Sequence, residues 1–160
     1  MDSSDRRRRL GLAVLGQFRV IYGSVRQQHR KVEQSCGITG AQLWLLHELR
    51  RDASIGVSDL AVRLSIHQST CSQLIDKLVR RRLLTRNAVP GDKRRVRLAL
   101  TGQARKCLRD GPRPAEGVLP TALLAMPDPS LRALYLQLDK LIAQLGKTDP
   151  RYRTQPLSAL

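Results

Sequence analysis

The spacing of apolar residues predicts two long helices near the ends of the chain. Between Arg9 and about Ser35 an apolar residue recurs every three or four positions, which is typical of one helical stripe. Its members are Leu10, Val14, Phe18, Ile21 and Val25. A second stripe consists of Leu131, Leu134, Leu138, Leu141, Ile142 and Leu145. Both stripes must be covered, by each other, by a second subunit or by both.

A shorter helix is predicted to begin at Thr39, where a capping box is encoded. The Thr39 hydroxyl and Gln42, three residues later, can satisfy each other's backbone donors. Leu45, Leu46 and Leu49 form its core face, and Trp44 and His47 lie off that face. Either Trp44 packs beneath another helix and His47 lies near the surface, or both line an effector pocket between helices.

The stretch from Ile55 to Thr101 predicts two short helices joined by a tight turn. The first runs from Asp59 to about Leu64 with Ser58 as its N-cap, and the turn is Ser65–His67. The second runs from Gln68 to about Arg81. Its buried stripe is Cys71, Leu74, Ile75 and Leu78. The opposite face carries Gln68, Ser69, Ser72, Gln73, Asp76 and Lys77, with Thr70 at its edge.

A two-stranded hairpin is predicted to follow. Leu83–Ala88 has the composition of a strand, 89–92 (VPGD) has turn chemistry, and 95–100 (RVRLAL) alternates apolar and polar residues. Helix, turn, helix and hairpin in this order predict a winged helix-turn-helix, which places its second helix in a DNA major groove. The fold class is therefore mainly α with a small β wing (α+β).

The C-terminal third predicts further helices and then a tail. A helix from Thr101 is expected to break at 111–114 (GPRP), because proline removes a helical donor. Asp128 is a suitable cap for the last helix, with Pro129 at its first position. Residues 1–36 and 101–146 are interpreted as dimerisation helices, 37–100 as the winged helix-turn-helix, and 147–160 as an unstructured tail.

The net charge of +16 indicates a polyanionic partner. Between Lys77 and Arg97 nine basic residues face the single acid Asp92, so this stretch carries 9 − 1 = +8. A membrane-binding helix would pair its basic face with aromatic anchors, whereas aromatic residues make up only 3% of the chain. Double-stranded DNA is favoured as the partner, and no membrane association is expected.

The pattern assigns base contacts to the second helix of the pair and minor-groove contacts to the hairpin tip. Small hydroxyls and amides allow close approach to base edges, and glutamine can bridge adenine N6 and N7. An ordinary solvated face would carry more Glu and Lys. The expected DNA-binding residues are Gln68, Ser69, Thr70, Ser72, Gln73, Lys77, Lys93, Arg94 and Arg95. Arg6–Arg9 are interpreted as a solvated, disordered terminus, or alternatively as an arm that contacts phosphates.

Other chemistries find little support in the sequence. Cys36, Cys71 and Cys107 lack zinc-ligand spacing, and their odd number argues against a disulfide framework. Cys71 falls on a core face and is expected to be a buried thiol. No catalytic constellation, cofactor motif or metal site is visible, so no enzymatic activity is expected. Without a membrane span or a complete signal peptide, the chain is expected to be cytoplasmic and nucleoid-associated.

Taken together, the motifs resemble the MarR-type (multiple antibiotic resistance regulator) winged helix-turn-helix family. Ile38-Thr39 with Gln42 is similar to the family's "LT..Q" opening, and Asp59–Leu64 to its "eLAerL" helix. Ser69-Thr70 with Leu74, Asp76 and Leu78 resembles the recognition helix, Asp92-Lys93-Arg94 the D-x-R wing, and Leu98–Thr101 the following "vsLT".

The resemblance implies a homodimer whose first and last helices interlock on a pseudo-palindromic operator. Asp92 would brace the wing and Arg94 would reach the minor groove. Most members are repressors released by a small ligand, often an aromatic acid, and others sense oxidants through a cysteine. A constitutive or architectural DNA-binding protein without an effector is the alternative, as is a cysteine-based redox-sensing regulator.

Three positions depart from the family pattern. Arg82 stands where glycine is usual before the first wing strand, and Gln73 stands where a basic residue is common. Both leave the operator preference open. Cys36 lies later than the sensing cysteine of the organic-peroxide branch, so that role is not transferred to it.

Overall fold

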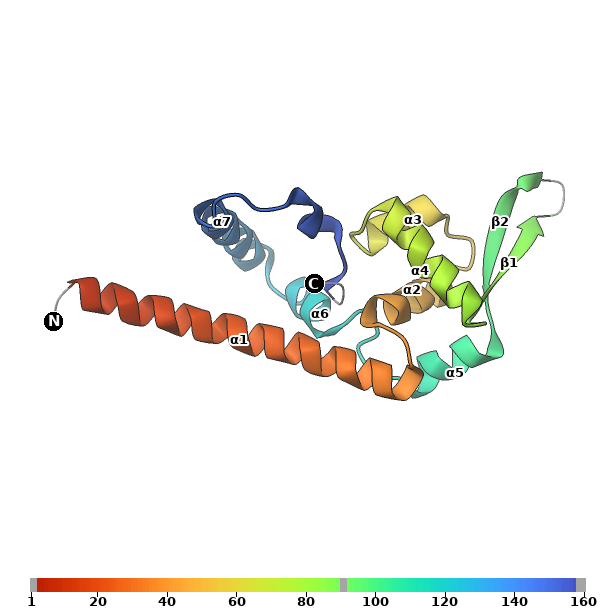
Figure 1. The fold of residues 1–160 in the computed structure, drawn as a ribbon, viewed down its shortest axis with the longest axis horizontal. Coiled ribbons are helices and arrows are strands. Elements are labelled where there is room, and N and C mark those ends of the chain that lie inside the picture. The colour runs from red at the N-terminus through yellow and green to blue at the C-terminus, as the bar shows by residue number, and fades with distance from the viewer. Residues whose placement is uncertain (1–2, 90–91, 158–160) are drawn as a thin grey trace.

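A computed structural model describes residues 3–89 and 92–157, except for the side chains of residues 92–95. Within these residues the chain is mainly helical, with one antiparallel hairpin (Figure 1). The elements are α1 (Ser3–Cys36), α2 (Gly40–Arg51), α3 (Val57–Arg63), α4 (Gln68–Arg80), β1 (Leu84–Val89), β2 (Asp92–Leu100), α5 (Gly102–Asp110), α6 (Val118–Leu124), α7 (Asp128–Gln144) and the 3-10 helix η1 (Pro150–Thr154). The predicted α+β class is confirmed.

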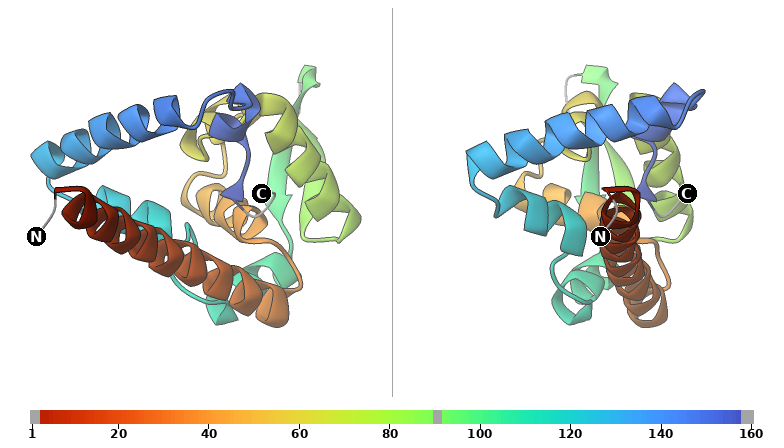
Figure 2. Two further views of the ribbon diagram at one scale, coloured as in Figure 1. Left: turned by 60° about the vertical axis from the view of Figure 1, so that its left-hand side comes forward. Right: turned by 90° about the vertical axis from the view of Figure 1, so that its left-hand side faces the viewer.

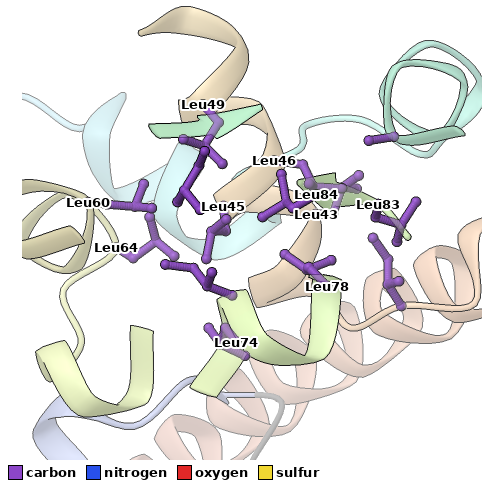
Figure 3. Close-up of a cluster of buried hydrophobic side chains, with 14 of the residues drawn as sticks. Leu43, Leu45, Leu46, Leu49, Leu60, Leu64, Leu74, Leu78, Leu83 and Leu84 are labelled. Carbon is purple, nitrogen blue, oxygen red and sulfur yellow. The ribbon is translucent and has the colours of Figure 1, made fainter. Parts of the chain in front are cut away.

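The core lies where α2, α3, α4 and the base of the hairpin meet (Figure 3). Leu45, Leu46, Leu60 and Leu78 are fully buried there. Each leucine removed from water in this way contributes roughly 1.5–3 kcal/mol. The predicted stripe of α4 is confirmed, since Cys71, Leu74, Ile75 and Leu78 are all buried. This core therefore holds the helix-turn-helix and the hairpin as one unit.

Helix α1 extends far beyond this core (Figures 1 and 2). Only Val25, Gln28 and Val32 are buried along its 34 residues. The helix already begins at Ser3, so the expectation of a disordered terminus at Arg6–Arg9 is wrong. An ion pair between Arg9 and Asp5, 2.8 Å apart at i,i+4, supports this first part of the helix.

The predicted N-cap of α2 is confirmed, whereas the predicted N-caps of α3 and α7 are not. The capping box of α2 is confirmed: the Gln42 N–H donates to the Thr39 hydroxyl at 3.3 Å, and the Thr39 N–H donates to Gln42 Oε1 at 2.9 Å. Helix α3, however, begins at Val57 with Gly56 as its N-cap instead of Ser58. Asp128 is the first residue of α7 and makes no side-chain cap.

Cys36 and Cys107 form a disulfide, which corrects the expectation drawn from the odd number of cysteines. Their Cα atoms lie 5.6 Å apart although they are 71 residues apart in sequence. The bond joins the end of α1 to α5, two segments whose proximity no local pattern reveals. Cys71, the third cysteine, remains a free, buried thiol.

The C-terminal third returns towards the helix-turn-helix. The predicted break at 111–114 is confirmed, because α5 ends at Asp110 and α6 begins at Val118. The tail was expected to be unstructured, yet η1 forms within it and Asp149 caps that helix through the Arg151 N–H at 2.9 Å. No helix in the described part of the chain is both long enough and apolar enough to cross a membrane.

Candidate nucleic-acid interface

Helices α3 and α4 are held together by a turn with unusual backbone geometry. Ser65 adopts a positive φ of 54°, and the Ile66 N–H donates to the Ala61 carbonyl at 3.0 Å. Leu60, Ala61 and Leu64 are buried on one side of the turn. The turn therefore directs α4 away from α3 while both helices share one core.

The face of α4 opposite its buried stripe is polar and open to solvent. The side chains of Gln68, Ser69, Gln73 and Lys77 are exposed, and those of Thr70 and Ser72 are half-buried. The structure thus brings all six predicted base-reading residues together on one helix. The Asp76 carboxylate on the same helix accepts from Arg86 of β1 at 2.5 Å. The only acid on this face is therefore paired with a cation.

The hairpin projects next to α4 (Figure 1). Leu84 pairs with Leu100 and Asn87 with Arg97, and the register shifts between Ala88 and Val89. Leu84 and Leu98 anchor the base of the hairpin in the core, whereas Val96 is 56% exposed. The expected alternation of buried apolar and exposed polar residues therefore ends where the hairpin leaves the core.

The predicted wing-tip residues lie at the far end of this hairpin. The backbone of Asp92, Lys93, Arg94 and Arg95 belongs to β2. Their side chains lie outside the described part of the structure, so the expected bracing by Asp92 and the contacts of the other three stay predictions.

Two further basic residues near α4 are not among the predicted DNA-binding residues. Arg80 at the end of α4 and Arg97 on β2 are exposed. The density of basic residues between Lys77 and Arg97 is the signal that could have identified them. Arg81 has a different role, because its guanidinium donates to the Gly37 carbonyl at the α1–α2 junction.

Arg82 lies between α4 and β1 in a left-handed conformation with φ 57°. This is the position where glycine is usual in the family that the sequence resembles. Glycine adopts this conformation without steric strain, whereas a side chain with a Cβ does not. The departure therefore places a strained, exposed arginine at the start of the wing.

An ionic cluster around the buried Glu48 fixes α3 against α2. Glu48 is only 4% exposed. Its carboxylate accepts from Arg63 at 3.2 Å and from the Trp44 indole at 3.3 Å. Arg63 also donates to Asp52 at 3.1 Å. The first helix of the helix-turn-helix is thereby tied to α2 through one arginine.

Trp44 and His47 line two different cavities instead of one. Trp44 belongs to a cavity of about 460 Å³ between α1, α2, α6 and the C-terminal segment. His47 belongs to a second cavity beside α5. There its Nε2 lies 3.1 Å from Glu116 and its Nδ1 lies 3.1 Å from an Arg50 guanidinium nitrogen. Within this chain the predicted pair is therefore not part of a single pocket.

Comparison with known proteins gives similarities that centre on this interface. A family model described as "MarR family" matches residues 37–95. The HTH-type transcriptional repressor MdtR of Bacillus subtilis is 33% identical over 67 residues, which are 42% of this chain and 43% of that protein. The chain thus spans less than half the length of this relative.

Solved structures share the fold over most of the chain. A crystal structure of a MarR family transcription regulator covers 91% of this chain and 98% of its own, with 20% identity and a TM-score of 0.54. A mutant of MepR from S. aureus bound to an oligodeoxyribonucleotide covers 82% of this chain and 97% of its own, with 22% identity and a TM-score of 0.50.

Proposed function

We propose that the chain is a transcription regulator of the MarR type, which a family model matches over residues 37–95, and that it represses transcription as a homodimer bound to a pseudo-palindromic operator. The observation that carries this proposal is α4. One face of this helix is buried, the other is a polar face without an unpaired acid, and a basic hairpin lies next to it. Such a helix fits a DNA major groove, and bound operator DNA implies a cytoplasmic, nucleoid-associated protein.

The uncovered apolar residues of α1 and α7 support the proposed second subunit. Leu10 is 65% exposed and Val20 is 70% exposed on α1, and α7 has no buried residue at all. The interpretation of residues 1–36 and 101–146 as dimerisation helices rests on these two stripes. Two copies that cover them would hold two α4 helices at a fixed spacing, about 34 Å for half-sites one helical turn apart.

Salt dependence and one matched pair of variants test the DNA contact. If a dimer neutralises roughly eight phosphates, the logarithm of the association constant should fall with the logarithm of salt concentration at a slope of about −7. Lys77→Ala on α4 should weaken binding and make the slope shallower by about two per dimer. Lys140→Ala on α7 removes the same charge away from α4 and should change neither. A duplex affinity independent of salt contradicts the proposal.

The release signal is proposed to be a small ligand, as the resemblance implies. The cavity of about 460 Å³ supports this, because its lining includes α1 and Ile66, two residues before α4. A ligand there can change the position of α4 relative to the helices proposed to form the dimer. A denaturation midpoint raised by candidate small molecules would identify binding, because a ligand that binds only the native state stabilises it.

The disulfide favours a second candidate, a regulator of the same fold that responds to oxidation. Disulfides in a reducing cytoplasm are usually transient, so Cys36–Cys107 would form and break there. Operator affinity measured after dithiothreitol and after a mild thiol oxidant tests this candidate. A change in affinity that disappears in Cys107→Ser but persists in Cys71→Ala supports it, and equal affinities in both states exclude it.

A further inference from the structure

The cavity lined by Trp44 joins parts of the chain that are far apart in sequence. Its walls come from α1, α2, the turn before α4, α6 and the C-terminal segment 152–157. Trp44, the only tryptophan of the chain, lies among them. The C-terminal segment contributes a wall made of Tyr152, Arg153, Gln155, Pro156 and Leu157. A bound molecule would therefore touch both the long helix α1 and the helix-turn-helix.

The lining of this cavity offers little to a charged ligand. Among its described residues the only carboxylate is Glu116 and the only guanidinium is Arg153. Each already faces a partner outside the lining: Glu116 lies 3.1 Å from His47, and Arg153 lies 3.5 Å from Asp139. Most other lining residues are apolar. An anionic ligand would lose its hydration without gaining a free cation, which is unfavourable.

His29 supplies a hydrogen-bonding group that the protein itself leaves unused. Its imidazole lines the cavity, and no described residue forms a hydrogen bond or ion pair with it. The ring lies against the backbone at Gly40, where a Cβ would come within 2.8 Å of His29 Cδ2. Burial lowers the pKa of His29, which favours the neutral ring. A neutral imidazole presents one donor and one acceptor.

Building on the proposed function, we infer that this cavity binds an uncharged, mainly apolar molecule with one hydrogen-bonding group, which His29 recognises. The chemistry differs from the aromatic acid that the family resemblance implies. Trp44 and the apolar side chains would bury the body of the molecule, and the C-terminal segment would enclose it. Contact with Ile66 would connect its presence to the start of α4.

Three probes with the same two-ring body test the ligand class on the full-length protein. 1-Naphthol is neutral with one hydroxyl, 1-naphthoate is an anion, and naphthalene has no polar group. Calorimetric titration at pH 7.5, with Trp44 fluorescence as a second signal, should show 1-naphthol binding at least about tenfold more tightly than 1-naphthoate. Equal or tighter binding of 1-naphthoate overturns the inference, as does the absence of 1-naphthol binding.

Variants of His29 test which residue recognises the hydroxyl. His29→Leu should weaken 1-naphthol binding about fivefold and leave naphthalene binding unchanged. His29→Gln retains a hydrogen-bonding group and should retain most of the affinity. If His29→Leu binds 1-naphthol as tightly as the unchanged protein, the assigned role of His29 is wrong.

A second pair of variants tests the position of the site. Leu119→Phe on α6 places a larger ring in the lining and should weaken binding of both 1-naphthol and naphthalene. Leu124→Phe, on the same helix but 79% exposed and outside the lining, should not. Equal effects of the two substitutions overturn this location. Operator binding by the ligand-free protein is measured separately. If the ligand-free protein does not bind DNA, the proposed function is contradicted. If it binds DNA but does not bind 1-naphthol, only the inference about the cavity is contradicted.

Discussion

At the scale of single residues, Arg82 and Cys71 have properties that their neighbours impose. Arg82 carries the strain of a left-handed backbone at the start of the wing. Cys71 is fully buried on the core face of α4, and this burial raises the pKa of its thiol to about 11. The sequence predicted the burial of Cys71 from helical spacing. For Arg82 the sequence showed only a departure from the family pattern. It did not show the left-handed backbone, because dihedral angles cannot be read from residue type.

Replacing Arg82 by glycine is expected to stabilise the protein. The left-handed conformation costs a residue with a Cβ about 1–2 kcal/mol, and part of this gain is offset by the greater freedom of glycine in the unfolded chain. Arg82→Gly should therefore raise the free energy of unfolding in urea by about 0.5–1 kcal/mol. Arg80→Gly, in the helical last turn of α4, is the matched control and should lower it. A destabilised Arg82→Gly protein contradicts this account.

Cys71 is expected to resist alkylation in the native, reduced protein. A thiol with a pKa near 11 instead of 9.0 has about a hundredth of the thiolate at pH 8. Treatment with iodoacetamide followed by peptide mass spectrometry should therefore label the half-buried Cys36 well before Cys71. Because burial raises this pKa, the thiol favours the native state below pH 9, and this contribution is lost as the pH rises towards 11. Rapid labelling of Cys71 at pH 8 would show that it is accessible.

At the scale of elements, the sequence predicted the features that depend on interactions between nearby residues. The capping box at Thr39, the buried stripe of α4 and the break after Asp110 depend on residues within a few positions of each other, and all three are confirmed. The Cys36–Cys107 disulfide and the return of the C-terminal segment depend on contacts between distant residues. No periodicity encodes such contacts, so the sequence analysis missed them. The side-chain contacts of the wing tip remain predictions.

The capping box should contribute measurably to the stability of α2. Thr39→Ala removes the oxygen that accepts from the Gln42 N–H. The expected loss is about 1 kcal/mol in the free energy of unfolding. Thr39→Ser retains the hydroxyl and should lose much less. If both variants unfold at the same urea concentration, the cap has no energetic role.

Reduction of the disulfide should destabilise the whole fold. Opening a loop of 71 residues increases the entropy of the unfolded chain, which corresponds to a loss of about 4 kcal/mol. The difference in unfolding free energy with and without dithiothreitol measures it. Cys71→Ala retains the bridge and should remain sensitive to dithiothreitol, whereas Cys36→Ser should not. Insensitivity of the unchanged protein would mean that the bridge adds no stability.

At the scale of the whole molecule, the described chain looks like half of an assembly. One end carries a compact helix-turn-helix and wing, and the other end carries α1 and α7 with apolar side chains open to solvent (Figures 1 and 2). The two apolar stripes were visible in the sequence, which could not decide between packing on each other and packing on a second subunit. In the single chain α7 buries none of its residues, and this observation supports the homodimer.

In the proposed dimer, two copies of α4, held at a fixed spacing, read one DNA site. Selection from random duplexes, sequenced after binding to the full-length protein, tests it most directly. We expect an enriched pseudo-palindrome whose half-sites lie about one helical turn, roughly 10 base pairs, apart. Enrichment of a single unrepeated site, or of no sequence at all, would contradict it.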